Sequence, residues 1–463
     1  MIIKNLETLL SHGNLAGREI ILDILQAGLA APDPYDNVIK LVRVEGRRLI
    51  VEGPDLSDPP GQAPLVFDLD QVGHIYVVGG GKAAQRMAEG LEDVLGDLIT
   101  AGQINAKKGD SVRLKRIPVT LAGHPLPDQD SVRGSQRIVE IERQARRGDI
   151  VFQIQSGGAT ALTALPAPGI SLADLQQVYR VLYFERGANM LAANAVRNQL
   201  VVLQGRHPRH VGDATFIQLH TAEIPPDLKV HLYEPPKPDD AYAAAIEVLH
   251  DYHCWNEMPE SVRAFLLQAD PHYSPLRPEE TQGKPHYYFR VMGPETMIEA
   301  ARARAQAFGL NAAIVATSLN DVEAQPVAHT FAFMANEIER MSRPIQPPCV
   351  LICGGELVVT VGDAPGIGGR NQEFVLTTAP QIADSPNIVI ASVDSEGTDG
   401  PTDKAGGIVD GLTMKRAGEA GLDLRHELVK HNSNGALETL GDAIHTGILP
   451  TNVRDLRLIY IGG

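Results

Sequence analysis

Five loops of this sequence place glycines next to charged or hydroxyl side chains. They are residues 79–82 (GGGK), 123–128 (GHPLPD), 156–160 (SGGAT), 354–373 and 394–403 (DSEGTDGPTD). Glycine-rich loops can turn several backbone N–H groups toward one anion, and a nearby Lys or Arg strengthens the attraction. Carboxylates on such a loop suit Mg²⁺ held together with phosphates. Together these groups match phosphoryl transfer, where catalysis is mostly positioning and charge neutralisation.

The first loop joins a short apolar run, residues 75–78, to a helical pattern. We predict that Gly79, Gly80 and Gly81 expose N–H groups to an anion and that Lys82 adds a full positive charge. The spacing is neither a Walker A loop nor GxGxxG, since Ala83 stands where a hydroxyl would hold Mg²⁺. The alternative is a tight turn with a solvated lysine.

The loop after the predicted strand 150–154 repeats this design with hydroxyl groups. Ser156, Gly157 and Gly158, followed by Thr160, could hold a phosphate or a carboxylate. Close packing of a strand against a helix also requires small residues, so this alternative stays open. His124 lies alone in a proline-rich loop, where a histidine is more often structural, and it could shape the site.

The densest glycine region ends in Arg370 and Asn371, just before a predicted helix. An arginine in that position can grip a carboxylate or phosphate through two parallel hydrogen bonds. The alternative is a hairpin loop with a surface arginine. However, the six glycines between residues 354 and 369 exceed what one hairpin needs.

The acidic loop offers Asp394, Asp399 and Asp403 after an apolar strand. It lacks the spacing and the terminal Glu of an EF-hand. We interpret it as a candidate Mg²⁺ site, and the alternative is a solvated acidic turn.

The elements around these loops predict an α/β protein. Strand, glycine turn and helix follow one another repeatedly, which is typical of a mostly parallel, doubly wound sheet. Helices are predicted over residues 17–31, 241–251 and 295–308, and one of the strands over residues 357–362. A second α/β block begins near Tyr287, after a Pro- and His-rich stretch between residues 205 and 240. Open α/β sheets bind ligands outside the carboxyl ends of their strands, where the glycine clusters fall.

Composition excludes several classes of protein. The 463 residues carry a formal net charge of −16, which argues against a nucleic-acid binder but allows a locally basic site. No apolar run reaches about 18 residues, so no membrane span is expected. Three cysteines cannot form a disulfide framework and are interpreted as buried thiols. We expect a soluble, cytoplasmic protein.

Seven segments, in this order, resemble the class II glycerate 2-kinases with a C-terminal MOFRL domain, sometimes labelled hydroxypyruvate reductases. They are VVGGGKAA (77–84), AGHPLPD (122–128), SGGATALTALP (156–166), CGGELVVTV (353–361), GGRNQEFVL (368–376), DSEGTDGPTDKAGG (394–407) and TNVRDL (451–456).

The resemblance implies a Rossmann-like domain over residues 1–240, a connecting helix and irregular segment over 241–285, and a smaller, mixed α/β MOFRL-like domain over 286–463, with a cleft between the two domains. It also implies transfer of the γ-phosphoryl group of ATP to the 2-hydroxyl of D-glycerate, or of a closely related hydroxy or sugar acid, with Mg²⁺.

The resemblance also implies roles for individual residues. Lys82 and Arg370 would be the catalytic cations. The acidic residues would lie on the metal side. The phosphate- or substrate-binding residues would be Gly79, Gly80, Gly81, Ser156, Gly157, Gly158, Asn194, Arg197 and Asn371.

The stretch between residues 194 and 240 departs from the family pattern. The Lys and His of the family segment NxVRKHLSxxKGG are here Asn198 and Gln199. The two aspartates and the SGP turn of the next family segment are absent, and Thr221, Glu223 or Asp227 could substitute for them.

Three functions therefore remain for the chain. The first is the kinase, with a hydroxy acid and a nucleotide as small-molecule partners, without nucleic acid or membrane, and with homo-oligomerisation open. A divergent paralogue that binds a related anion or nucleotide with little or no turnover is the second. An NAD-dependent reductase is the third, and the absence of GxGxxG with a following acidic residue disfavours it.

Overall fold

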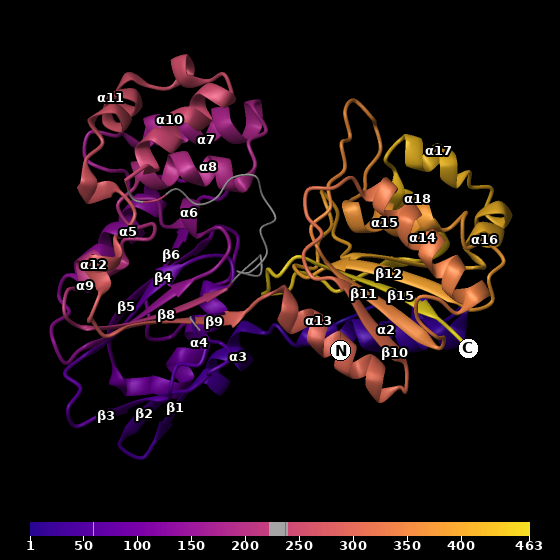
Figure 1. Ribbon diagram of the computed structural model, residues 1–463, viewed down its shortest axis with the longest axis horizontal. Helices are drawn as coiled ribbons and strands as arrows, with labels where there is room; N and C mark the ends of the chain where they lie inside the picture. The colour runs from indigo at the N-terminus through magenta and orange to yellow at the C-terminus, as the bar shows by residue number, and fades with distance from the viewer. Residues whose placement is uncertain (59, 222–236, 238) are drawn as a thin grey trace. The chain divides into compact units, whose positions relative to one another are not determined.

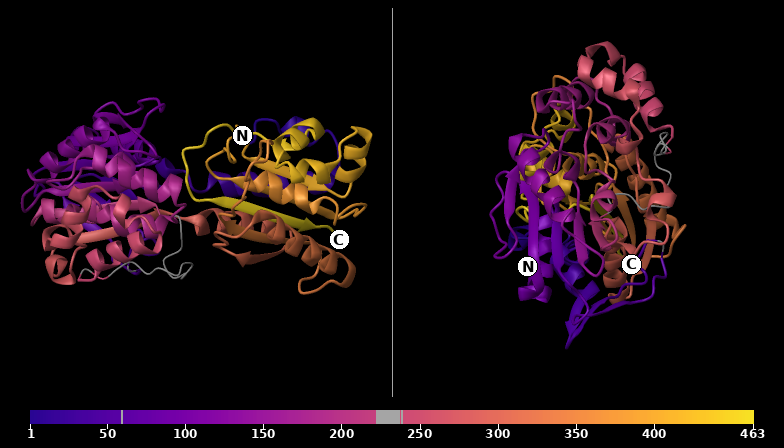
Figure 2. Two further views of the ribbon diagram at one scale, coloured as in Figure 1. Left: turned by 90° about the horizontal axis from the view of Figure 1, so that it is seen from above. Right: turned by 90° about the vertical axis from the view of Figure 1, so that its left-hand side faces the viewer.

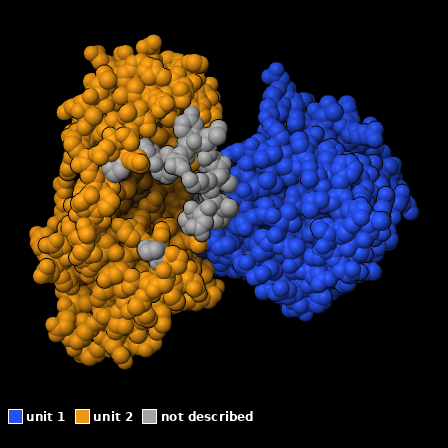
Figure 3. Space-filling view, viewed as in Figure 1, with its two compact units in different colours: residues 1–33, 222–230, 292–463 blue, residues 34–221, 231–291 orange. Residues whose placement is uncertain are grey.

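The computed structural model describes residues 1–58, 60–221, 237 and 239–463 of the chain. These residues form two compact units, which Figure 3 colours separately. Of the described residues, unit 1 comprises 1–33 and 292–463. Unit 2 comprises 34–58, 60–221, 237 and 239–291. Each unit is built around its own six-stranded sheet.

Unit 2 contains a doubly wound sheet with the strand order β6-β5-β4-β7-β8-β9. Figure 1 labels five of these strands, all but β7. Its strands are β4 (Ile75–Gly80), β5 (Ile99–Lys107), β6 (Val119–Ala122), β7 (Ile150–Gln155), β8 (Thr215–Thr221) and β9 (His286–Met292). The pairs among β4 to β8 are parallel. From β4 the chain winds outward through β5 and β6, and then returns to add β7 and β8 on the other side. The winding therefore reverses between β4 and β7.

Both faces of this sheet are buried, as a parallel sheet requires. Along β4, Ile75 and Val77 pack with α3 (Pro34–Leu41), α4 (Ala84–Leu95) and the small antiparallel sheet of β1 (Val42–Glu45), β2 (Arg48–Val51) and β3 (Leu65–Asp68). The intervening Tyr76 and Val78 pack with α5 (Gln129–Glu142) and α9 (His207–Val211) on the other face.

A helical layer follows the carboxyl end of β7. It shares one apolar core, which includes Leu175, Val196, Leu249 and Leu266. Its main members are α6 (Ala159–Leu162), α7 (Leu172–Tyr179), α8 (Met190–Arg197), α10 (Ala241–Asp251) and α11 (Glu260–Gln268). This layer gives the residues after β7 a rigid support.

Unit 1 contains a mixed sheet with the strand order β10-β11-β15-β12-β13-β14. The strands are β10 (Asn311–Ala316), β11 (Cys349–Gly355), β12 (Ile388–Asp394), β13 (Gly406–Asp410), β14 (Ala443–Ile444) and β15 (Asp455–Ile461). β15 pairs antiparallel with both β11 and β12, so β11 and β12 run in the same direction. β15 therefore lies inside this sheet rather than at its edge, and it is the long yellow strand in the left view of Figure 2.

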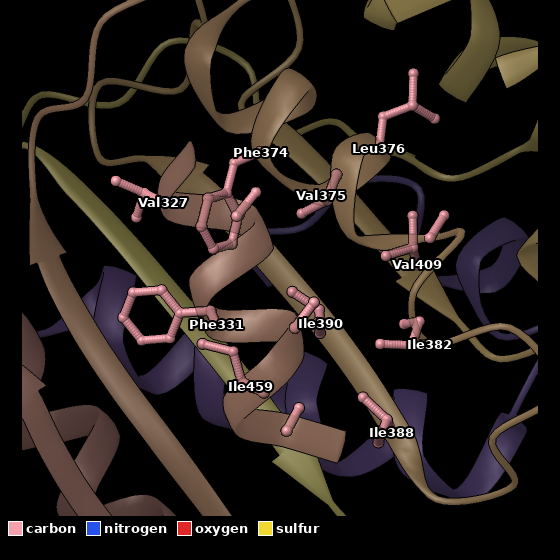
Figure 4. Close-up of a cluster of buried hydrophobic side chains, with 14 of the residues drawn as sticks. Val327, Phe331, Phe374, Val375, Leu376, Ile382, Ile388, Ile390, Val409 and Ile459 are labelled. Atoms are coloured by element: carbon pink, nitrogen blue, oxygen red, sulfur yellow. The ribbon is translucent and has the colours of Figure 1, made fainter. Parts of the chain in front are cut away.

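Helices cover both faces of the unit 1 sheet. On one face, Ile390 and Ile459 pack against Phe331 of α14 (Ala324–Met341) and Phe374 of α15 (Arg370–Thr378), as Figure 4 shows. On the other face lie α2 (Leu15–Ala30) and α13 (Pro294–Ala307), which pack against each other. The remaining helices are α1 (Leu6–Leu9), α16 (Thr413–Glu419), α17 (Leu424–Val429) and α18 (Ser433–Leu440).

The α/β class, with a mostly parallel Rossmann-like sheet and a smaller mixed domain, is confirmed. The observed units divide the chain differently from the expected limits, because Met1–Asp33 belongs to unit 1 and β9 joins the sheet of unit 2. The strand predicted over residues 357–362 is wrong: only Val358 makes a bridge, to Glu323. Gly355, with φ +103°, ends β11 beside the backbone of Leu319.

Two smaller expectations are also resolved. All three cysteines are buried and free, as predicted. Among the residues that the structure describes, no helix is both long and apolar enough to cross a membrane.

Candidate active site

The loops predicted to carry chemistry in unit 2 follow β4 and β7, where the winding of the sheet reverses. These two strands are parallel neighbours, with Gly80 opposite Gln155. Loops at such a reversal part to opposite faces of the sheet and leave room for a ligand at the carboxyl edge. The predicted residues of unit 2, from Gly79 to Arg197, therefore begin at a topological switch point.

The structure corrects the reason for the glycines at 79–81. A Cβ on Gly79 would lie 2.0 Å from the carbonyl oxygen of Ile154, and one on Gly81 would lie 2.1 Å from Ser156 Oγ. Both residues have strongly positive φ, +145° and +138°. These glycines let the two loops approach each other. They do not form the predicted anion cradle, because the N–H of Gly81 donates to Asn105 O and that of Lys82 donates to Gly157 O.

The second loop is closer to the predicted cradle. Ser156 Oγ accepts from Ala83 N at 3.0 Å, so this hydroxyl ties the loop to the start of α4. Gly158 has φ +83° and turns the chain into α6. Within the described part of the chain, the N–H groups of Gly157 and Gly158 donate no hydrogen bond. Two adjacent donors are thus available at the edge of the sheet.

Positive charge gathers around this loop. A Cβ on Gly158 would meet His124 Cδ2 at 3.0 Å and Lys82 Cγ at 3.4 Å, so these two side chains flank the glycine. Burial, together with the charges of Lys82, Lys107 and Arg197, lowers the pKa of His124 to about 4. The imidazole is therefore neutral near pH 7, and Lys82, Lys107 and Arg197 are the cations close enough to act on it.

Arg197 is held in place by its neighbours. Its Nε donates to Asn194 Oδ1 at 2.7 Å, and its Nη2 donates to Thr160 Oγ1 at 3.2 Å. The guanidinium also lies over the rings of Tyr179 and Tyr183, at 5.1 and 4.9 Å. In this arrangement Asn194 and Thr160 orient the cation, and Arg197 is only 7% exposed.

The second set of predicted residues lies in unit 1, at the carboxyl ends of β11 and β12. Arg370 begins α15 and donates to both oxygens of Asp455, at 2.8 to 3.2 Å, and to Asp394 Oδ2 at 2.7 Å. Its Nη1 lies 3.4 Å from a carboxylate oxygen of Glu356. Arg370 is therefore a fixed cation in a ring of three carboxylates, with its side chain 19% exposed.

The two aspartates in this ring titrate differently. Burial is the largest influence on Asp394 and, with the nearby Asp455 carboxylate, raises its pKa despite Arg370. Burial acts in the same direction on Asp455, but Arg370 and Arg457 outweigh it and hold the pKa of Asp455 below its usual value. Of these two aspartates, Asp455 is therefore the one whose ionised form the neighbouring arginines favour more.

Sequence reasoning missed several members of this cluster. Arg457 donates to Asp455, and Arg454 lies 3.1 Å from a carboxylate oxygen of Glu356 and donates to Asn320 Oδ1. The segment TNVRDL contains Arg454 and Asp455, so a signal was present. The ion pair between Arg370 and Asp455 could not be predicted from the sequence, because the two residues are 85 positions apart.

Asp399 holds the N-terminus of α15. Its carboxylate accepts from the backbone N–H groups of Asn371 and Gln372 and from both of their side-chain amides, at 2.9 to 3.2 Å. It thus closes the N-terminus of α15 and is fully buried. Asn371 in turn accepts from Ser392 Oγ on β12. These contacts fix the helix that begins with Arg370.

The predicted trio of metal ligands is not assembled. Asp394 is paired with Arg370, Asp399 is occupied by α15, and Asp403 is exposed and paired with Lys404 Nζ at 2.7 Å. Across the described residues, no group of three or more His, Cys, Asp or Glu side chains is arranged to hold a metal ion. Two residues considered as substitutes, Glu223 and Asp227, lie outside the described part of the chain.

Two family models match the chain. The model of a domain of unknown function, DUF4147, matches residues 20–267, and the MOFRL family model matches residues 349–455. The first covers the loops around Lys82, and the second covers the cluster around Arg370.

Named relatives match over nearly the whole chain. A glycerate 2-kinase from Pyrococcus horikoshii is 35% identical over 451 residues, 96% of this chain and 97% of the relative. A D-glycerate 2-kinase from Thermotoga maritima is 35% identical over 84% of this chain and 90% of its own. The crystal structure of glycerate kinase from Thermotoga maritima superposes with a TM-score of 0.79 at 30% identity, covering 96% of this chain and 99% of that one. With its DUF4147 and MOFRL domains, this chain belongs to the glycerate 2-kinase family of phosphotransferases.

Proposed function

We propose that this protein transfers the γ-phosphoryl group of ATP to the 2-hydroxyl of D-glycerate, or of a closely related hydroxy acid, to give 2-phosphoglycerate. The observation that carries the proposal is the cationic edge of unit 2, where Lys82 and two available N–H groups lie together after β4 and β7. The relatives named glycerate kinase support the choice of acceptor.

Lys82 would stabilise the phosphoryl group during transfer. Negative charge develops on the oxygens of that group, and a fixed cation near them lowers the barrier. The N–H groups of Gly157 and Gly158 would hold a neighbouring phosphate oxygen. Because His124 is neutral, it could donate or accept a hydrogen bond there without adding to the repulsion among the cations.

In unit 1, Arg370 would be the cation that binds an anionic group of the substrate. Its contacts with Asp394 and Asp455 fix the direction of the guanidinium, while Nη1 has, among the described residues, the 3.4 Å contact with Glu356. A carboxylate such as that of glycerate could replace Glu356 at this nitrogen.

Mg²⁺ enters the proposal as part of the substrate MgATP. The residues described do not fit a resident metal site, because Asp399 and Asp403 are engaged elsewhere and no ligand group is formed. Mg²⁺ commonly keeps its waters and binds mainly through nucleotide phosphates. We therefore assign no catalytic step to a metal held by this chain.

The test is a kinase assay with MgATP and D-glycerate, in which ³¹P NMR identifies the product. We expect 2-phosphoglycerate from the wild type, and a loss of about 100-fold or more in kcat for Lys82→Met, since one charge-stabilising group is removed. Arg370→Lys keeps a charge for the two aspartates but loses the forked geometry, so it should also lower kcat. The exposed Arg133→Ala is the matched control and should keep full activity.

Other outcomes would contradict the proposal. Nucleotide binding without any product from a panel of hydroxy acids would favour the divergent paralogue that binds without turnover. Oxidation of NADH in the presence of hydroxypyruvate would favour the reductase. 3-Phosphoglycerate as the product would refute transfer to the 2-hydroxyl.

A further inference from the structure

Glu356, the first residue after β11, places its carboxylate between two arginines of unit 1. Its Oε1 lies 3.4 Å from Arg370 Nη1, and its Oε2 lies 3.1 Å from Arg454 Nη1. The side chain of Glu356 is 40% exposed, whereas those of Arg370 and Arg454 are 19% and 7% exposed. A surface carboxylate therefore covers two cations that the protein otherwise encloses.

Both arginines have further partners that hold them in place. Arg370 uses Nε and Nη2 for the two aspartates described above, so Nη1 is the nitrogen next to Glu356. Arg454 Nη1 also donates to Asn320 Oδ1 at 2.9 Å. If the Glu356 carboxylate moved away, these contacts would keep both guanidinium groups where they are. Donors that are fixed in advance in this way favour an anion that takes the place of Glu356.

Glu356 is the most loosely held of the three carboxylates in this ring. Hydrogen bonds between a charged nitrogen and a carboxylate are usually about 2.7–2.9 Å long. Asp394 and Asp455 reach this range, at 2.7 and 2.8 Å, whereas the contacts of Glu356 are 3.1 and 3.4 Å long. The backbone of Glu356 is fixed, since its N–H donates to Asn320 Oδ1 and its carbonyl oxygen accepts from Asp321 N. Only the side chain has to turn to uncover the two arginines.

The charges in the ring indicate which kind of ligand would replace Glu356. When this side chain turns away, one negative charge leaves the space between Arg370 and Arg454. A carboxylate restores that charge one for one and matches the planar fork of a guanidinium. A terminal phosphate would instead bring about two negative charges to a ring that keeps the carboxylates of Asp394 and Asp455. The ring therefore favours a carboxylate over a phosphate.

We propose that Arg370 and Arg454 together bind the carboxylate of the acceptor, and that Glu356 occupies their outer side until the acceptor displaces it. Arg454 is then a substrate-binding residue, and Glu356 is a built-in competitor that sets how tightly the acid binds. An uncharged polyol cannot replace the charge of Glu356, so the same exchange selects acids over polyols.

This inference rests on the proposed function for the choice of a hydroxy acid as the acceptor, but its chemistry requires only a small carboxylic acid. Isothermal titration calorimetry of the full-length protein with D-glycerate tests it, in buffer that contains MgADP. This nucleotide cannot donate a γ-phosphoryl group, so binding is measured without turnover. Glycerol, which has the same carbon chain without the carboxylate, is the uncharged probe and should not bind measurably.

Two variants should move the affinity in opposite directions. Glu356→Gln keeps the size of the side chain but removes its charge, so it should bind D-glycerate about two- to fivefold more tightly than the wild type, the range expected when a partly exposed ion pair no longer competes. Arg454→Met should weaken D-glycerate about tenfold or more, because a charged hydrogen-bond donor is lost. A purely structural ion pair would not give a gain of affinity when Glu356 loses its charge.

Matched controls separate the local effect from the change in net charge. Glu419→Gln and Arg340→Met alter exposed residues of unit 1 and should leave the affinity for D-glycerate unchanged. Circular dichroism checks that each variant is folded, and the partly exposed Glu356→Gln carries the test if Arg454→Met does not fold. Wild-type or weaker binding of D-glycerate by folded Glu356→Gln, or normal binding by folded Arg454→Met, would overturn the proposal. Tighter binding of inorganic phosphate but not of D-glycerate by Glu356→Gln would assign these arginines to a phosphate and overturn it as well.

Failure of this inference is distinguishable from failure of the proposed function. Binding of D-glycerate that follows Glu356 and Arg454 as expected, without phosphoryl transfer to any hydroxy acid, would support the carboxylate site and refute the kinase. Formation of 2-phosphoglycerate with a KM for D-glycerate that neither Glu356→Gln nor Arg454→Met changes would do the opposite.

Discussion

His124 is the residue whose chemistry differs most from what the sequence suggested. A single histidine in a proline-rich loop looked structural, yet it lies against Gly158 and Lys82 at the cationic edge of unit 2. Lys82 itself was predicted from its place after three glycines. The structural role of those glycines could not be predicted. They allow two loops to come into close contact, and that contact depends on how the two strands pair in the sheet, which the sequence of one loop does not reveal.

We predict that His124 reports the binding of phosphate groups. In the free protein its imidazole should titrate with a pKa of about 4 in ¹H–¹⁵N NMR spectra, and His124→Gln identifies its signals. An anion bound between Lys82 and Arg197 offsets their charge, so MgATP should raise this pKa. Lys82→Met should raise it as well. A titration unchanged by both would show that the phosphates bind elsewhere.

The lowered pKa of His124 also predicts how the stability of the protein depends on pH. Because the folded state binds this proton only near pH 4, the unfolded chain, with an ordinary histidine pKa of about 6.5, takes it up first as the pH falls. The contribution of His124 to stability is therefore full above about pH 6.5 and is lost between about pH 6.5 and 4. Urea titrations of wild type and His124→Gln across this window should diverge as the pH falls.

At the scale of elements, α15 is the helix that positions Arg370. The helix begins with Arg370, and Asp399 closes its first turn from the acidic loop. The strand–glycine–helix order of this region could be predicted from the sequence. The contact of Asp399 with the helix could not, since an acidic loop of this composition is equally compatible with metal binding, solvent or a helix terminus.

Asp399→Asn and its neighbour Asp403→Asn form a matched pair. The first replaces a carboxylate that accepts four hydrogen bonds by an amide with one acceptor, so it should destabilise the fold by about 1–3 kcal/mol. The second changes an exposed side chain and should leave the unfolding midpoint unchanged. Urea denaturation measures both. An equal rise in the Mg²⁺ concentration needed by both variants would instead make the two aspartates metal ligands.

At the scale of the whole molecule, the path of the chain decides which sheet each helix packs on. The helical period over residues 17–31 correctly predicted α2, but an amphipathic pattern does not reveal which sheet its apolar face covers. The structure places α2 on the sheet of unit 1, with Gly28 against Leu456 and Gly17 against Val389. Arg18, fully buried, fixes this helix through ion pairs with Asp410 and Asp442.

Arg18→Leu should therefore destabilise the protein by about 3–5 kcal/mol, because it leaves buried carboxylates without their shared cation. The matched control is Arg304→Ala, which removes an exposed ion pair between α13 and Asp23 of the same helix α2 and should not change the midpoint. Chemical denaturation followed by circular dichroism compares them. Equal midpoints for Arg18→Leu and wild type would mean that apolar packing alone holds α2.

The position of β15 has a consequence for biosynthesis. This strand lies between β11 and β12, although it follows every other strand of unit 1 in the chain. On the ribosome, β11 and β12 thus remain without their shared neighbour, and α2 without Leu456, until the residues of β15 have emerged. Nearly all strands of unit 2 are synthesised much earlier, so unit 2 can fold before unit 1 is complete. The open edges of β11 and β12 are then the part of the nascent chain most exposed to mispairing and most in need of a chaperone.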